Sequence, residues 1–186
     1  MGNPAPMHLA RNGIVSGARY VASPNCDERP AGEAVSLLVV HSISLPPGEY
    51  GGDSIERFFT NRLDHEAHPY FRTIRGLRVS AHFLVRRDGE VVQFVPVGRR
   101  AWHAGASIWR GRARCNDYSV GVELEGMDDA PFDPAQYAGL GALVHALRAG
   151  LPLSAIAAHS DIAPLRKTDP GVLFDWPRCL ALFARS

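Results

Sequence analysis

The apolar positions of the chain predict three buried strands. Residues 37–40, within a first element at 35–44, are continuously apolar, as in a strand covered on both faces, and lead directly into His41. Residues 118–125 alternate, which places Val120, Val122 and Leu124 on one face of a second strand. A third apolar run at 154–159 predicts another buried strand, and it also ends in a histidine.

A hairpin and several helices complete the predicted pattern. The β-rich arms 79–86 and 90–95 flank Asp88-Gly89, a strong tight-turn signal. Residues 134–149 predict the clearest helix, with Asp133 as N-cap and Gly150 as its end. Gln136 completes the capping box, and Pro134 occupies the first helical position. The apolar stripe of this helix contains Leu140, Leu143, Val144 and Leu147. Shorter helices are expected after Asp53 or Ser54, and after Asp175, the latter carrying Trp176, Leu180 and Phe183.

Together these elements predict a mixed α/β fold, with a central mixed β-sheet flanked by helices in a single domain. Residues 1–34 are rich in Pro, Gly, Ala and Asn and predict an irregular N-terminal arm. Residues 35–186 would then form the main domain. A chain of 186 residues is long enough to bury one substantial core.

Composition narrows the classes of partner. A formal net charge of +1 gives no electrostatic reason to expect nucleic acid or an anionic membrane. The three cysteines are far apart and form no Cys-x-x-Cys motif, which suits a reducing compartment better than a disulfide framework. We see neither a secretory signal nor a membrane span, so we expect a cytoplasmic protein. We further expect a monomer whose partner is a small-molecule substrate.

Two histidines and one aspartate form the first candidate site. His41 and His159 each end a predicted strand and each precede a serine, and Asp169 follows ten residues after His159. Two imidazoles and a carboxylate, with a fourth position open to water, are typical of a catalytic zinc site. The same donors suit non-haem iron, and the residues alone do not separate the two metals.

A single lysine lies between two of these candidate ligands. All other basic side chains are arginines, and Lys167 stands between His159 and Asp169. A compact ammonium suits stabilisation of one developing oxyanion. Glu123 and Glu125, on one face of the second strand, are both candidates to take a proton from water, although both could instead face solvent. The residues predict metal-assisted hydrolysis of an amide or ester.

At this point the motifs resemble those of the zinc amidase family that includes phage-type lysozyme amidases and peptidoglycan recognition proteins. The resemblance extends over about residues 19–182 and is long and ordered, hence specific. It is carried by residues 37–49, 77–82, 87–90, 100–105, 114–126 and 166–171.

The resemblance implies a role for each candidate. His41, His159 and Asp169 would hold one Zn²⁺, Glu123 would be the general base, and Lys167 would stabilise the transition state. Substrate-binding positions would be Arg78, Trp102, Arg114, Asn116 and Arg166. Ser42 departs from the asparagine that often follows the first histidine in the family, which puts one substrate hydrogen bond in doubt. His82 and His103 are not expected to be ligands; His103 could border the groove.

The implied activity is hydrolysis of the amide between the lactyl group of 1,6-anhydro-N-acetylmuramic acid and L-alanine, in cytoplasmic peptidoglycan recycling. Two alternatives stay open within the family: an amidase acting on intact peptidoglycan, and a muropeptide-binding module without activity. A non-haem iron oxygenase fits the ligand types but gives Lys167 no role.

Overall fold

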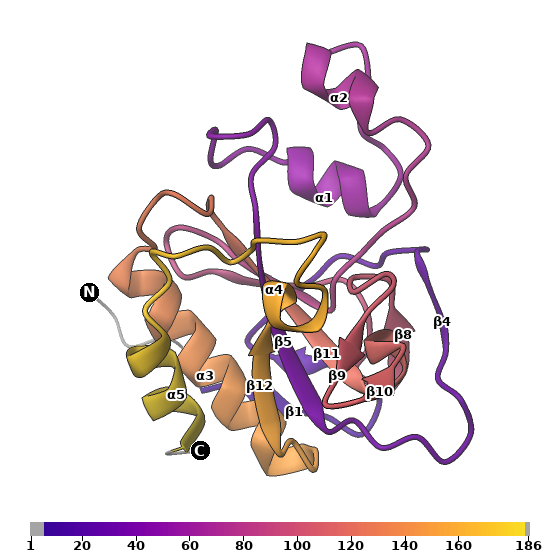
Figure 1. Cartoon of the computed structure of the whole chain (residues 1–186), viewed down its shortest axis with the longest axis vertical. Coiled ribbons are helices and arrows are strands. Elements are labelled where there is room, and N and C mark those ends of the chain that lie inside the picture. The colour runs from indigo at the N-terminus through magenta and orange to yellow at the C-terminus, as the bar shows by residue number, and fades with distance from the viewer. Residues whose placement is uncertain (1–5, 185–186) are drawn as a thin grey trace.

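The structure is a computed structural model that describes residues 6–184, and a six-stranded sheet forms its centre (Figure 1). The first four strands in spatial order are parallel, the fifth is antiparallel to the fourth, and the sixth is parallel to the fifth. In that order they are β12 (Ala155–Ala158), β5 (Leu37–Ile43), β11 (Ser119–Glu125), β6 (Phe83–Val85), β7 (Val91–Gln93) and β3 (Arg19–Tyr20). The expected mixed α/β fold with a central mixed sheet is confirmed.

Helices α3 (Pro134–Gly150) and α5 (Trp176–Ala184) cover one face of the sheet (Figure 1). The alternation predicted for β11 is confirmed, because Val120, Val122 and Leu124 all belong to the core beneath α3. The four leucine and valine positions of the α3 stripe are buried as predicted. The predicted final helix with Trp176, Leu180 and Phe183 is confirmed as α5, in which Leu180 is half exposed and Cys179 is buried.

The N-terminus of α3 is held by the predicted capping residues. The backbone N–H of Asp133 donates to Oε1 of Gln136 at 3.0 Å. The side-chain nitrogen Nε2 of Gln136 also donates to the backbone carbonyls of Val85 and Glu125, at 3.2 and 3.0 Å. Gln136 therefore fixes the start of the helix and anchors it to β6 and β11.

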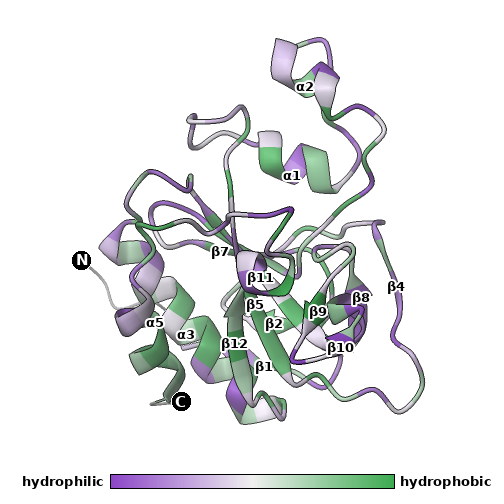
Figure 2. Cartoon of the chain, viewed as in Figure 1, coloured by the Kyte–Doolittle hydropathy of each residue, from purple (hydrophilic) through white to green (hydrophobic). Residues whose placement is uncertain are grey.

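The opposite face of the sheet is covered by short elements. Two small clusters of buried apolar residues lie here, one beneath α1 and α2 and one beneath β9, β10 and α4. These elements are α1 (Ser54–Phe59), α2 (Pro69–Thr73), β8 (Arg99–Ala101), β9 (Ile108–Trp109), β10 (Arg112–Ala113), the 3₁₀ helix η1 (Cys115–Asp117) and α4 (His159–Ile162). Figure 2 shows that β5 and β12 are strongly hydrophobic, whereas α2 is largely polar.

The predicted arm, apart from its residues 1–5, which lie outside the described part, is not irregular throughout. It forms β1 (His8–Leu9), β2 (Val15–Ser16), β3 and β4 (Cys26–Glu28). β3 extends the main sheet beside β7, and β4 pairs with β8. These strands contain two or three residues each, too few for a periodic pattern to reveal them. The division of the chain at residue 34 stays a prediction.

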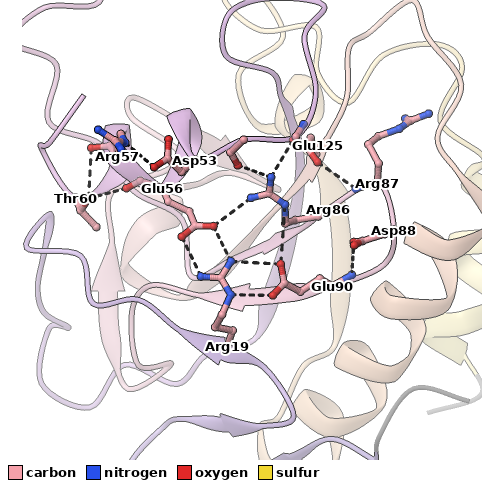
Figure 3. A network of polar contacts seen from close by, with 12 residues as sticks. Arg19, Asp53, Glu56, Arg57, Thr60, Arg86, Arg87, Asp88, Glu90 and Glu125 are labelled. Atoms are coloured by element: carbon pink, nitrogen blue, oxygen red, sulfur yellow. Dashed lines mark hydrogen bonds and ion pairs between the residues drawn. The ribbon is translucent and has the colours of Figure 1, made fainter. Parts of the chain in front are cut away.

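A network of alternating charges joins β3, α1 and the hairpin (Figure 3). Arg19 contacts Glu56 at 2.6 Å and Glu90 at 2.8 Å. Arg86 contacts Glu56 at 3.1 Å and approaches Glu125 to 3.7 Å. Since Arg86 and Glu56 are largely shielded from solvent, this network fastens α1 to the edge of the sheet more firmly than exposed pairs would.

No helix among residues 6–184 is long and apolar enough to cross a membrane.

Candidate active site

The candidate site lies where three neighbouring parallel strands end. Glu123 of β11 is directly opposite His41 of β5 in the strand register. On the other side of β5, Ala158 is opposite Val40, so His159 follows beside His41 at the first position of α4. Parallel strands end at the same edge of a sheet, which is where ligand sites of open α/β sheets form. The sheet therefore sets the spacing of three candidate residues.

Asp169 reaches the same place from the loop after α4. Its backbone carbonyl accepts a hydrogen bond from the N–H of Ser160 at 3.0 Å. Its Oδ2 lies 3.0 Å from Nδ1 of His159 and 3.2 Å from Nδ1 of His41. The two Nδ1 atoms are 2.9 Å apart. Three donor atoms from distant parts of the chain thus converge on one point.

These residues fit a divalent metal. Burial lowers the pKa of His41 to about 4, against the opposing effect of its contact with Asp169. Burial alone would raise the pKa of Asp169, but its close contacts with His159 and His41 hold that pKa well below its usual range. At neutral pH the set therefore offers a neutral imidazole and a carboxylate anion, the protonation states that metal binding requires.

Glu123 is buried beside this cluster and faces the same cavity. Its Oε2 is buried and accepts no hydrogen bond from residues 6–184. Burial raises the pKa of Glu123 well above its usual value, the negative charge of Asp169 raises it further, and Lys167 opposes both. A buried, unpaired carboxylate with an elevated pKa is the state expected of a proton acceptor in a catalytic site.

Glu125, the second candidate base, has a different environment. It too is buried, so the expectation that either glutamate could face solvent was wrong. Its two oxygens accept hydrogen bonds from the backbone N–H groups of Gly51, at 2.7 Å, and Arg87, at 3.2 Å. Glu125 therefore holds two loops to the end of β11 and does not line the cavity.

Lys167 lines the cavity together with the three donor residues and Glu123. Its ammonium makes no hydrogen bond or ion pair with any residue between 6 and 184. Its backbone N–H donates to the carbonyl of Ala163 at 3.0 Å, which holds this position at the end of the α4 turn. The side chain is thus anchored at its base and available to a ligand at its tip.

The cavity itself has a volume of about 700 Å³, enough for a sugar or a short peptide segment. One wall is apolar and comes from α1, α2 and the segment that follows them. Residues 126–129 also line the cavity. The apolar wall contains Phe58, Phe59, Tyr70, Ile74, Leu77 and Val79.

The predicted substrate residues do not all meet here. Trp102 lines the cavity, whereas Arg78 is exposed and lies outside its lining. Arg114 and Arg166 line a second, mainly apolar hollow over β9 and α4. Asn116 lines neither, and its Oδ1 accepts hydrogen bonds from backbone N–H groups.

Asp128 is a cavity residue that the sequence did not suggest. It accepts hydrogen bonds from Ser42, at 3.0 Å, and from Thr168. It therefore links the end of β5 to the loop that carries Lys167 and Asp169. A single acidic residue in a loop gives no pattern that could have revealed this contact. Ser42, where the sequence departs from the family, is one of its partners.

His82 and His103 are not among the three residues whose donor atoms converge. His82 is fully buried next to β6; its Nδ1 accepts from the N–H of Gly121, and its Nε2 donates to the carbonyl of Arg99, both at 3.0 Å. His103 borders the cavity and contacts His41.

Comparison with known proteins identifies the family of the chain. The sequence profile of the N-acetylmuramoyl-L-alanine amidase family matches residues 31–172. The 1,6-anhydro-N-acetylmuramyl-L-alanine amidase AmpD of Salmonella typhimurium is 55% identical over 180 residues, 96% of each chain. AmpD of Escherichia coli is 54% identical over 179 residues, 95% of this chain and 98% of the relative.

Solved structures of amidases also match this chain. The crystal structure of a Se-Met AmpD derivative matches with a TM-score of 0.91 at 55% identity, covering 94% of this chain and 98% of that one. AmiD from E. coli, in complex with anhydro-N-acetylmuramic acid-L-Ala-D-gamma-Glu-L-Lys, matches with a TM-score of 0.59 at 28% identity, covering 95% of this chain and 65% of that one. The chain belongs to the N-acetylmuramoyl-L-alanine amidase family and is a hydrolase that cleaves an amide bond.

Proposed function

We propose that this amidase hydrolyses the bond between the lactyl group of 1,6-anhydro-N-acetylmuramic acid and L-alanine in muropeptides released from the cell wall, with one zinc ion. The observation that carries the proposal is the convergence of His41, His159 and Asp169 beside Glu123 and Lys167 in one cavity. The substrate follows from the AmpD relatives, whose names specify the anhydro sugar.

His41, His159 and Asp169 would hold the zinc ion, because their donor atoms face one another and the lowered pKa values of His41 and Asp169 leave those two groups free of protons at neutral pH. When bound, zinc supplies Lewis acidity toward a carbonyl and a water molecule. Two imidazoles and one carboxylate leave a coordination position open, as catalytic zinc sites do.

Glu123 and Lys167 would carry out the proton transfer and charge stabilisation. Glu123 takes a proton from the attacking water, whose oxygen adds to the lactyl carbonyl carbon. Lys167 stabilises the negative charge that develops on the carbonyl oxygen. When the C–N bond breaks, Glu123 returns the proton to the nitrogen of L-alanine. The products are a lactyl carboxylate and a peptide with a free amine.

The cavity wall would select the sugar. Trp102 offers an aromatic face, and the apolar wall suits a compact bicyclic sugar without ionic groups. We assign Arg78, Arg114, Asn116 and Arg166 no direct part in the cavity, and their role toward the stem peptide stays a prediction. Arg114 and Arg166, which line the second hollow, would bind carboxylates of a stem peptide that extends beyond the cavity.

We further propose that the enzyme works in the cytoplasm as a monomer on soluble fragments. Cys26, Cys115 and Cys179 are all free thiols, which suits a reducing compartment. Recycling of wall fragments would supply the substrate there.

Mass spectrometry of products from a defined anhydro-muramyl tripeptide tests the proposal. We expect release of the free tripeptide, loss of activity after treatment with a chelator, and recovery with zinc. Insoluble sacculi and a muropeptide with a reducing sugar form the comparison arms. A preference for sacculi would instead favour an amidase of intact peptidoglycan, and binding without cleavage in any arm would favour a recognition module.

A further inference from the structure

We infer that His103 is a positioning residue that fixes the tautomer of His41, so that Nδ1 of His41 presents a lone pair to the metal. The inference rests on the metal site of the proposed function. It concerns a chain of hydrogen bonds that runs away from the site, through His103 and Ser119, to the carbonyl of Cys115.

The direction of each hydrogen bond in this chain follows from the bond at its far end, between Ser119 and Cys115. The Ser119 hydroxyl lies 2.6 Å from the carbonyl oxygen of Cys115, which can only accept, so the hydroxyl proton is donated there. Its oxygen must then accept from Nε2–H of His103, at 3.1 Å. A neutral His103 with its proton on Nε2 has a lone pair on Nδ1.

That lone pair determines how His41 is protonated. Nδ1 of His103 is 2.9 Å from Nε2 of His41 and can only accept, so His41 carries its proton on Nε2. The other nitrogen of His41, Nδ1, is left as the donor atom that faces His159 and Asp169. Partners of this kind are known to fix ligand orientation and to raise metal affinity in metalloproteins generally.

The fold has made specific room for the His103 ring. A Cβ atom at Gly121 would lie 2.4 Å from Cγ of His103, so only glycine at this position of β11 lets the ring lie against the strand. The backbone is held as well: the N–H groups of His103 and Ala104 both donate to Oδ1 of Asn116, at 3.2 and 2.8 Å.

Residues 103–104 also contact His159, the second histidine of the proposed metal site. The carbonyl of Ala104 lies 3.4 Å from Nε2 of His159 and can only accept, which favours the same tautomer there. That carbonyl also accepts from Arg166 at 2.8 Å. Residues 103–104 thus contact both imidazoles on the side away from Asp169.

Zinc affinity, measured by competition with a chromophoric chelator, tests the inference. His103→Leu keeps a side chain of similar bulk without an acceptor, and His103→Asn places an amide oxygen near the position of Nδ1. We expect the zinc dissociation constant to rise by about 10–100-fold in His103→Leu. His103→Asn should recover most of that loss. His145→Leu, which removes an exposed histidine of α3, is the matched control and should bind as the wild type does.

Thermal unfolding of each variant in excess chelator shows whether the fold is intact without zinc, so that a loss of affinity can be assigned to the site. Equal zinc affinity in wild type and His103→Leu would overturn the inference while leaving the proposed function standing. An equal loss in His103→Leu and His103→Asn would also overturn it, because the acceptor would then be irrelevant. A wild type that binds no zinc would instead remove the proposed metal site itself.

Discussion

Two glutamates only two positions apart on β11 have opposite environments, and this difference determines their chemistry. Glu125 is buried with hydrogen bonds to both oxygens, whereas Glu123 lines the cavity and has one buried oxygen without a partner among the described residues. A buried carboxylate without partners costs stability, and proteins keep such groups mainly where function requires them. Side-chain type alone could not separate the two residues.

Replacement of Glu123 by glutamine should lower kcat/KM by about 10²–10⁴-fold, the usual contribution of a general base. The volume is unchanged and a buried charge is removed, so the unfolding midpoint should stay the same or rise. Steady-state kinetics and urea unfolding give the two measurements. Glu125→Gln is the control and should lose stability more than activity; the reverse pattern would exchange the two roles.

Replacement of Lys167 by methionine should lower kcat by about 10²–10³-fold, in the range found when one oxyanion-stabilising donor is lost. The side chain has no described partner, so stability should change little. Zinc content, measured by mass spectrometry of the metal, should stay at the wild-type level. We expect Lys167→Arg to be nearly as inactive, because a broad guanidinium does not replace a compact ammonium. Wild-type turnover in either variant would remove this role.

His82 should make the fold sensitive to acid. Burial, together with the positive charge of Arg29, lowers the pKa of His82 to about 3, whereas an unfolded histidine titrates near 6.5. Between these values the unfolded chain binds the extra proton, so stability is full above about pH 6.5 and falls as the pH drops toward 3.

The comparison is urea unfolding of wild type and His82→Asn between pH 7 and pH 5, in chelator. Asparagine offers an oxygen to the N–H of Gly121 but does not titrate. We expect the variant to be less stable at pH 7 and to lose less stability on acidification. Parallel pH curves for the two proteins would show that His82 does not contribute.

At the scale of elements, the contact between α3 and the hairpin depends on glycines. A Cβ at Gly139 would lie 2.5 Å from the carbonyl oxygen of Gly89, and a Cβ at Gly89 would lie 2.6 Å from the carbonyl oxygen of Ala135. Gly89 also has a positive φ of 89°, as its place in the turn requires. The helix can therefore approach the hairpin more closely than side chains would allow.

Gly139→Ala should lower the free energy of unfolding by about 1–3 kcal/mol, since backbone must move to admit the methyl group. Gly141→Ala is the matched control in the same helix, because its Cβ would meet only the tip of the Leu182 side chain, at 2.9 Å. There the higher helix propensity of alanine should leave stability equal or raise it by up to about 1 kcal/mol. Equal effects in urea unfolding would contradict the close approach.

At the scale of the whole molecule, the sequence predicted the central strands and α3 well because their patterns are long. The face assignment of β11 followed from alternation over seven residues, and the convergence of His41, His159 and Glu123 follows from parallel strands ending together. Contacts made by short or irregular segments could not be predicted in this way. The joining of β3 to the sheet, the linking role of Asp128 and the separation of Arg114 and Arg166 from the main cavity depend on loop paths that leave no periodic pattern.

The metal site should also stabilise the whole fold, because its ligands come from β5, α4 and the loop before α5. Zinc that binds only the folded state at a free concentration 100 times its dissociation constant adds about 2.7 kcal/mol. Thermal unfolding with zinc and with chelator measures the difference. Asp169→Asn should abolish the zinc-dependent part, and an equal rise in that variant would indicate binding elsewhere.

The solitary lysine has a practical consequence. Apart from the α-amino group of the chain, Lys167 is the one primary amine in a sequence whose other basic side chains are guanidinium groups, and it lines the cavity. Amine-reactive reagents therefore have a single side-chain target. Reductive methylation with ¹³C-formaldehyde would place one pair of NMR-visible methyl groups at this position without mutagenesis. Occupancy of the cavity could then be followed as a shift of one signal.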